Sequence, residues 1–241
     1  MADDWLVNAF SLMEANPDAG IICGRGEAVF ETEAPIWFKR YQANYAVGPQ
    51  YPENGTVSES QKFLYDAGSV LRKTSIQGVI NSGFTPMLES RSKNKLLSGD
   101  NTEIQVILRL TGWKVQYNDS LRFKHFMPAS RLNWQYFLAL KRALGASKVY
   151  LDLYEPLLQG NQYDSSKKGR ANLMTKLLLD LLALFTLGLH RYEGNYRTAK
   201  ASALLGEFLE KLRIRRQQHQ IHQRFNENLE AIFNLDKSSQ F

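Results

Sequence analysis

Residues 96–113 of the chain read LLSGDNTEIQVILRLTGW, a polar segment that runs directly into an apolar, periodic one. Ile104, Ile107 and Leu108 recur at the spacing of one face of an α-helix, so they predict a helix with a buried side. Gly112 is typical of the residue that follows a helix, because glycine adopts the left-handed backbone conformation without strain. We therefore expect a polar loop, then a helix, then a turn at Gly112.

The acidic side chains at the start of this helix have two interpretations. Asp100 and Glu103 have the spacing of a capping box, in which both side chains bond to free backbone N–H groups at the helix start. Alternatively, the loop presents a carboxylate to a substrate. The local sequence leaves both interpretations open.

The composition is that of a globular protein, because 44% of the 241 residues are hydrophobic and 12% are aromatic. A formal net charge of +6 favours anionic partners such as nucleotide phosphates or acidic lipids, although many ordinary soluble proteins have the same balance. Cys23 is the only cysteine, which excludes an intramolecular disulfide and a cysteine-based metal site. The first residues lack the basic and apolar regions of a secretory signal, so we expect a cytoplasmic protein.

The order of apolar segments predicts an α/β protein. One amphipathic helix precedes several short apolar segments of the strand type. The helix covers residues 3–15, and the strands cover 19–24, 27–30, 114–117 and 121–126. A second amphipathic helix follows, and Gly145 is expected to end it.

The remainder of the chain is predicted to be helical. Residues 173–189 are very apolar, but Lys176 and Asp180 interrupt them, and a membrane-spanning helix needs about 20 mostly apolar residues. We therefore expect a buried helix there, or one that lies on a membrane surface. The predicted organisation is a sheet-and-helix domain over residues 1–145 and a helical extension over 146–241.

Four short motifs follow one another within residues 3–145. They are Trp5-Leu6 with Glu14 to Gly20, the small-residue run Ala67 to Arg72, the segment Ser98 to Gly112, and His125-Phe126-Met127-Pro128 with Arg131-Leu132 and Trp134-Gln135-Tyr136. Their order and spacing resemble the acceptor-side, C-terminal half of a family 2 glycosyltransferase of GT-A fold.

This resemblance implies a partial GT-A (Rossmann-like) domain followed by an α-helical C-terminal region. It also implies an inverting transfer of a sugar from a nucleotide-diphosphate donor to an acceptor hydroxyl, in polysaccharide or cell-surface glycan synthesis. The expected partners are the nucleotide sugar and a glycan or lipid-linked acceptor, and the C-terminal helices are candidates for peripheral contact with the inner face of a membrane. A divalent metal, Mg²⁺ or Mn²⁺, is expected to stabilise the leaving diphosphate.

The resemblance assigns roles to individual residues. The carboxylate that removes the acceptor's proton belongs to the third motif, where Asp100, Asn101 and Glu103 are the candidate catalytic positions. His125 is the candidate ligand of the metal or the diphosphate. The candidate substrate-binding residues are Ala67, Gly68, Ser98, Gly99, Arg131 and Trp134.

Two features depart from the family's pattern. Alignment of Ser98-Gly99 puts Asn101 at the position of the general base, and an amide accepts no proton at neutral pH. Asp100 is therefore the expected base, with Glu103 as the alternative. The family's nucleotide-binding segment and its metal-binding Asp-x-Asp motif would precede residue 1, and Asp3-Asp4 fits the start of a helix instead.

These departures support a second hypothesis, a catalytically inactive, truncated remnant or a module that binds a glycan or a protein partner. A third hypothesis, nucleic-acid binding, rests only on a basic cluster near the C-terminus, so we expect no specific nucleic-acid partner. The cluster comprises Lys211, Arg213, Arg215 and Arg216.

Overall fold

The computed structural model of the protein describes residues 4–58, 63–88, 99–160 and 192–238. It contains a four-stranded sheet in the order β2-β4-β1-β3. The strands are β1 (Ala19–Phe30), β2 (Gly55–Thr56), β3 (Val70–Leu71) and β4 (Lys114–Met127). The long strands β1 and β4 are parallel, and the two-residue strands β2 and β3 pair with them in the antiparallel direction at the edges. The predicted α/β class is confirmed.

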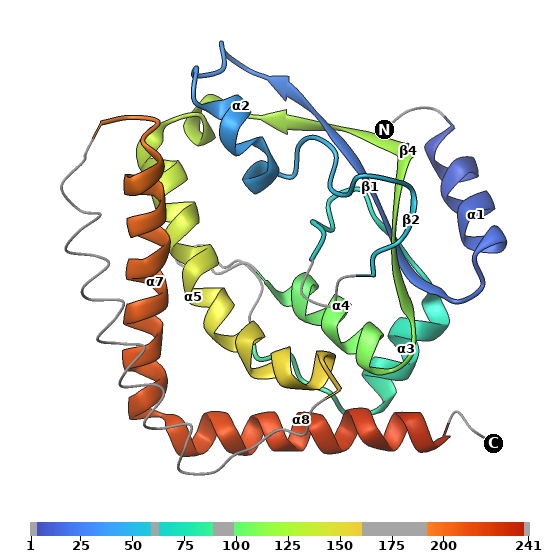
Figure 1. The fold of residues 1–241 in the computed structure, drawn as a ribbon. Coiled ribbons are helices and arrows are strands. Elements are labelled where there is room, and N and C mark those ends of the chain that lie inside the picture. Colours follow the sequence, from blue (N-terminus) through green and yellow to red (C-terminus); the bar gives the residue numbers. More distant parts are fainter. Residues whose placement is uncertain (1–3, 59–62, 89–98, 161–191, 239–241) are drawn as a thin grey trace.

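Helices lie on both faces of this sheet. Helix α1 (Trp5–Ala15) packs on one face, and α3 (Lys73–Asn81) and α4 (Asp100–Leu110) lie on the other (Figure 1). Trp5 and Ala9 of α1 contact Leu121 of β4. The predicted N-terminal helix and the helix that ends before Gly112 are both confirmed, and Gly112 has the expected positive φ of 84°.

Each central strand is one continuous element, so the predicted breaks within them are wrong. Two glycines lie inside β1, where neighbouring backbone comes so close that no side chain would fit. A Cβ atom at Gly24 would lie 1.9 Å from the carbonyl oxygen of Leu121, and one at Gly26 would lie 2.0 Å from that of Ala46. The segment 118–120 is part of β4, and the ladder between the two strands only shifts register beside it.

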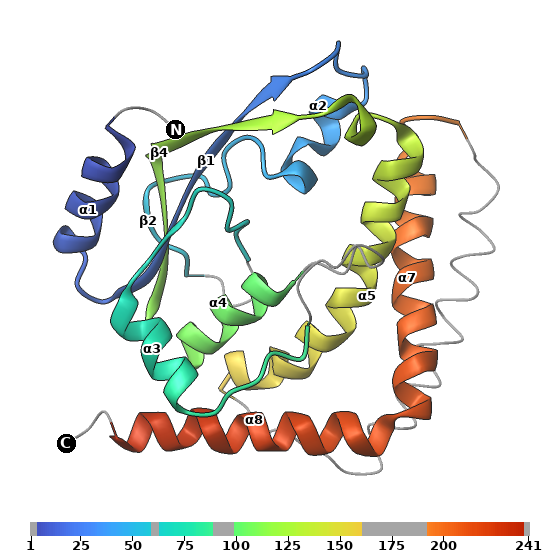
Figure 2. The same cartoon turned by 180° about the vertical axis from the view of Figure 1, so that it is seen from behind.

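The C-terminal part of the described chain is helical. Its helices are α5 (Trp134–Leu158), α7 (Tyr196–Arg216) and α8 (Gln218–Ser238). Figure 2 shows α5 and α7 side by side, with α8 running along the edge of the molecule below α3 and α5. The predicted apolar helix at 173–189 lies outside the described residues. Within the described ranges, no helix combines the length and the apolar character needed to cross a membrane.

The prediction that a helix ends at Gly145 is wrong, because α5 continues through this residue to Leu158. The glycine instead allows α7 to cross α5 at close range. A Cβ atom at Gly145 would lie 1.9 Å from the carbonyl oxygen of Ala203, and one at Gly206 of α7 would lie 1.9 Å from that of Arg142. The division between residues 145 and 146 therefore falls inside one continuous helix.

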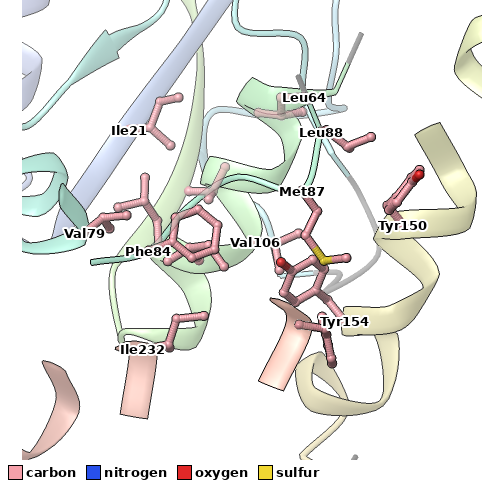
Figure 3. Close-up of a cluster of buried hydrophobic side chains, with 14 of the residues drawn as sticks. Ile21, Leu64, Val79, Phe84, Met87, Leu88, Val106, Tyr150, Tyr154 and Ile232 are labelled. Atoms are coloured by element: carbon pink, nitrogen blue, oxygen red, sulfur yellow. The ribbon is translucent and has the colours of Figure 1, made fainter. Parts of the chain in front are cut away.

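The main hydrophobic cluster, part of which is drawn in Figure 3, joins the sheet to helices α3, α4, α5, α7 and α8. Ile21 contributes from β1, Val79 from α3, Val106 from α4, Tyr154 from α5 and Ile232 from α8. All five side chains are buried, so the N-terminal sheet and the C-terminal helices share one core.

A second, aromatic cluster attaches the far end of the β1–β4 pair to α5. It involves the short helices α2 (Phe38–Tyr41) and η1 (Gln42–Tyr45), and Leu132, which directly follows the short helix η2 (Ala129–Arg131). The rings of Tyr41 and Phe137 lie 4.5 Å apart between their centroids, and Trp37 packs beside both.

Gly206→Ala is predicted to lower the free energy of unfolding by about 1–3 kcal/mol, because its methyl group meets the backbone of α5 and separates the two helices. Urea unfolding followed by circular dichroism measures the change. Lys200→Ala, at an exposed position of the same helix, is the control and is expected to unfold like the wild type. Equal stability of Gly206→Ala and the wild type would contradict the close crossing.

Candidate functional site

A pocket of about 730 Å³ lies between the two hydrophobic clusters. Its walls come from residues 43–50, residues 63–67, the first turn of α4, the end of β4 and residues 131–144. A volume of this size accommodates a small organic ligand. The titratable side chains that line it are Tyr45, Tyr65, Asp66, His125, Arg131 and Tyr136.

Residues 63–67 form one wall of the pocket without belonging to a strand, and two buried amide side chains hold their backbone. Gln105 of α4 accepts from the N–H of Leu64 at 3.1 Å and donates to its carbonyl at 2.6 Å. Gln50 accepts from the N–H of Tyr65 at 2.5 Å and donates to its carbonyl at 3.2 Å. These amides replace the hydrogen bonds that neighbouring strands would provide, so the wall is fixed.

The ring of Tyr65 is fixed as well. Its hydroxyl donates to the carbonyl of Gly48 and accepts from the N–H of Gly26 at 3.0 Å. Burial raises the pKa of this phenol above its usual value, so Tyr65 stays neutral and keeps its proton for the Gly48 bond. Tyr65 therefore connects the pocket wall to β1.

Asp66 and Asn101 meet inside the pocket. Asn101 lies in the first turn of α4, and its Nδ2 donates a hydrogen bond to Oδ2 of Asp66. Both residues line the cavity. The N-terminal end of a helix also favours a negative charge nearby, so this position suits a carboxylate.

Glu103, the alternative base, lies in the core instead of the pocket. Its side chain is fully buried and accepts hydrogen bonds from the backbone N–H of Met87 at 3.0 Å, the N–H of Leu88 at 2.9 Å and the hydroxyl of Tyr154 at 2.6 Å. Burial raises the pKa of Glu103 from 4.5, against the opposing effect of these hydrogen bonds. Glu103 therefore holds residues 87–88 and α5 against α4.

The capping-box interpretation is wrong. The residue before the first helical turn is Gly99, which has no side chain with which to cap the helix. Glu103 makes its hydrogen bonds to residues distant in sequence, as described above. Gly99 is buried against Leu88 and Ser147 with a φ of 156°, so it supports the helix start from behind the pocket.

Two of the predicted residues extend into the pocket from β4 and η2. His125 is half-buried near the end of β4, and its ring centroid lies 5.9 Å from that of Phe123. Arg131 ends η2, and its carbonyl accepts a hydrogen bond from the hydroxyl of Tyr45 at 3.2 Å. Arg131 therefore supplies the positive side chain of the pocket lining.

The remaining predicted residues have different surroundings. Ala67 lines the pocket. Gly68 has a φ of 65° and packs against the ring of Phe123, so it shapes the turn after the pocket wall. Trp134 belongs to the aromatic cluster, 5.2 Å from Trp37, and does not line the pocket. Ser98 lies outside the described residues, and the side chain of Asp100 is likewise not among those described.

The described residues do not fit a resident divalent metal. No three His, Cys, Asp or Glu side chains gather within the described ranges in a way that could hold one. In the pocket, His125 and Asp66 share the walls with Arg131, whose charge opposes a cation. His125 could contribute one ligand.

Sequence reasoning did not identify Asp66 or the tyrosines of the pocket. Asp66 directly precedes the small-residue run Ala67 to Arg72, so a carboxylate next to a predicted acceptor-site motif was the available signal. Tyr136 belongs to the fourth motif and Tyr45 to an aromatic-rich segment, but the sequence assigned neither a role, because an aromatic side chain in an amphipathic pattern normally packs in a core.

No protein-family model, no curated protein and no solved structure matches the chain. The resemblance to family 2 glycosyltransferases therefore stays a prediction from the four motifs.

Glu103→Gln is predicted to lower the free energy of unfolding by about 1–3 kcal/mol, because one of the buried donors around position 103 then faces an NH₂ group. Urea unfolding measures this loss. Glu230→Gln, at an exposed position on α8, is the matched control and should leave stability unchanged.

The same pair of proteins has a defined pH dependence. Since the folded pKa of Glu103 is raised from 4.5, the folded state binds more protons than the unfolded state between the two pKa values. The stability of the wild type relative to Glu103→Gln is therefore greatest below pH 4.5 and declines as pH rises through the folded pKa. A constant difference between pH 4 and pH 8 would contradict a raised pKa.

Proposed function

We propose that the pocket is the acceptor side of an inverting glycosyltransferase that uses a nucleotide-diphosphate sugar. The observation that carries this proposal is a convergence of residues from four separate segments. Ala67, Asn101, His125 and Arg131 were assigned roles from motif resemblance, and all four line one cavity. Motifs that are separate along a chain need not meet in its fold. The meeting of these four residues in one cavity therefore supports a common site.

The chemistry of the lining suits a sugar and a phosphate. Tyr45 and Tyr136 are stacked with ring centroids 6.3 Å apart, and such flat apolar surfaces can cover one face of a sugar ring. Asn44 and Asn101 offer amide groups to hydroxyls. Arg131 is the side chain suited to a leaving diphosphate, because a guanidinium stabilises negative charge that develops during transfer.

A second candidate function is binding of a glycan without transfer. The observation that favours it is the amide of Asn101 at the position where the family's general base is expected. The same tyrosines and amides would then hold a sugar without activating it.

The expected location, in the cytoplasm and peripheral to the inner face of a membrane, remains part of the proposal. The basic cluster of α7 contributes less to it than the sequence suggests. Lys211 is buried and pairs with Glu207 at 2.7 Å, and Arg213 pairs with Glu210 at 3.3 Å. Arg215 and Arg216 are the exposed cationic residues that remain at the end of this helix for an acidic lipid surface.

Transfer from UDP-glucose, UDP-N-acetylglucosamine and GDP-mannose to nitrophenyl glycosides tests the proposal. The assay uses the full chain, with and without any coding sequence in frame upstream, in the presence of Mg²⁺ or Mn²⁺. Arg131→Ala is expected to lower kcat/KM by about tenfold or more, since it removes positive charge from the pocket, and Arg215→Ala is the control.

Two results would contradict the proposal. The first is the absence of both transfer and donor hydrolysis in the extended chain. The second is calorimetric binding of a glycan with no binding of any nucleotide sugar, which supports the glycan-binding module instead.

A further inference from the structure

The pocket contains a carboxylate that the motif comparison does not assign. Among the described residues that line it, Asp66 is the only one with a carboxyl group. It lies on the wall that Gln50 and Gln105 fix, next to the backbone of Tyr65. A rigid wall matters for proton transfer, because a general base must stay within hydrogen-bond reach of the proton that it removes.

Asn101 holds this carboxylate in place. Its Nδ2 donates a hydrogen bond to Oδ2 of Asp66, and this bond fixes the orientation of the carboxyl group in the pocket lining. An amide is suited to this task since it donates a hydrogen bond but does not compete for the proton. The residue that looks like a lost base in the sequence is thus a partner of a carboxylate in the structure.

Glu103 is not available for the same reaction. Its two oxygens accept three hydrogen bonds in the core, and its side chain is fully buried. A base in that position would have to break these bonds and would still not reach the pocket lining.

We propose that Asp66 is the catalytic base of the pocket and that Asn101 is its positioning residue. This inference rests on the proposed function. In the step, the carboxylate of Asp66 takes the proton of the acceptor hydroxyl, and the acceptor oxygen forms a bond to the anomeric carbon of a nucleotide-diphosphate sugar. The bond between that carbon and the diphosphate breaks, and the diphosphate leaves with the electron pair.

The pocket provides neighbours for each participant. Arg131 lines the cavity and suits the departing negative charge, and His125 lines the same cavity. The tyrosine pair, Tyr45 and Tyr136, covers the sugar that brings the hydroxyl. Each of these groups comes from a segment other than that of Asp66, so the arrangement depends on the fold and not on a local motif.

The test compares kcat and KM of Asp66→Asn and Asp100→Asn in the preparation that is active in the transfer assay. Asp66→Asn is expected to lower kcat at least about 100-fold with little change in KM, because a positioned general base contributes about that factor. The loss in Asp100→Asn is expected to be smaller. Asp152→Asn, on the exposed side of α5 where it pairs with Lys148, is the isosteric control outside the pocket.

Asn101 is tested by a double-mutant cycle. Asn101→Ala alone is expected to lower kcat about tenfold, the effect of one hydrogen bond to a charged group. In the Asp66→Asn background the same substitution is expected to have no further effect, because there is no carboxylate left to position. Asp66→Glu and thermal unfolding of every variant separate a catalytic loss from a folding defect.

The outcomes of the inference and of the proposed function are distinct. The absence of transfer and donor hydrolysis from the wild-type protein, in the upstream-extended form as well, overturns the proposed function, and this inference with it. An active wild type in which Asp66→Asn turns over normally, or in which Asp100→Asn loses more activity than Asp66→Asn, overturns the inference alone. Independent, multiplicative effects of the Asp66 and Asn101 substitutions would overturn the positioning role.

Discussion

The fold depends on hydrogen bonds that buried polar side chains of α4 make to backbone outside the sheet. Gln105 pairs with both backbone groups of Leu64, and Glu103 accepts from the N–H groups of Met87 and Leu88. Each of these buried groups, left unpaired, would cost about 1–3 kcal/mol. Helix α4 therefore supplies backbone hydrogen-bond partners to two segments that belong to no strand, and it can do so because these polar side chains face inward.

This arrangement creates the space for the pocket. Residues 63–67 are held by side chains and not by a ladder, and the edge strands β2 and β3, which flank them in the sequence, are only two residues long. The β1–β4 pair extends well past them, and the aromatic cluster fastens its far end to α5. The cavity lies between that pair, the first turn of α4 and α5. A complete strand at 63–67 would direct alternate side chains away from this space.

The sequence predicts what is determined locally. The start of α4 and the turn at Gly112 follow from residues within a few positions of one another. The role of Glu103 does not, because its three donors lie 15, 16 and 51 residues away. Gly24 and Gly145 mislead for the same reason. Each carries a local signal for a break, and each is retained in a regular element because backbone from elsewhere in the chain packs against it.

The candidate site has the same dependence on distant parts of the chain. The motif comparison points to the first turn of α4, which lines the pocket, and it assigns the proposed base to that turn. Asn101 and Asp66 are 35 residues apart and meet in the pocket lining through a hydrogen bond. An amide and a carboxylate have nearly the same shape, so a facing pair can exchange the two groups between its segments and still place one carboxylate in the pocket. An asparagine at the family's base position therefore does not by itself indicate a dead enzyme, because the charge of a pocket is a property of the facing walls together.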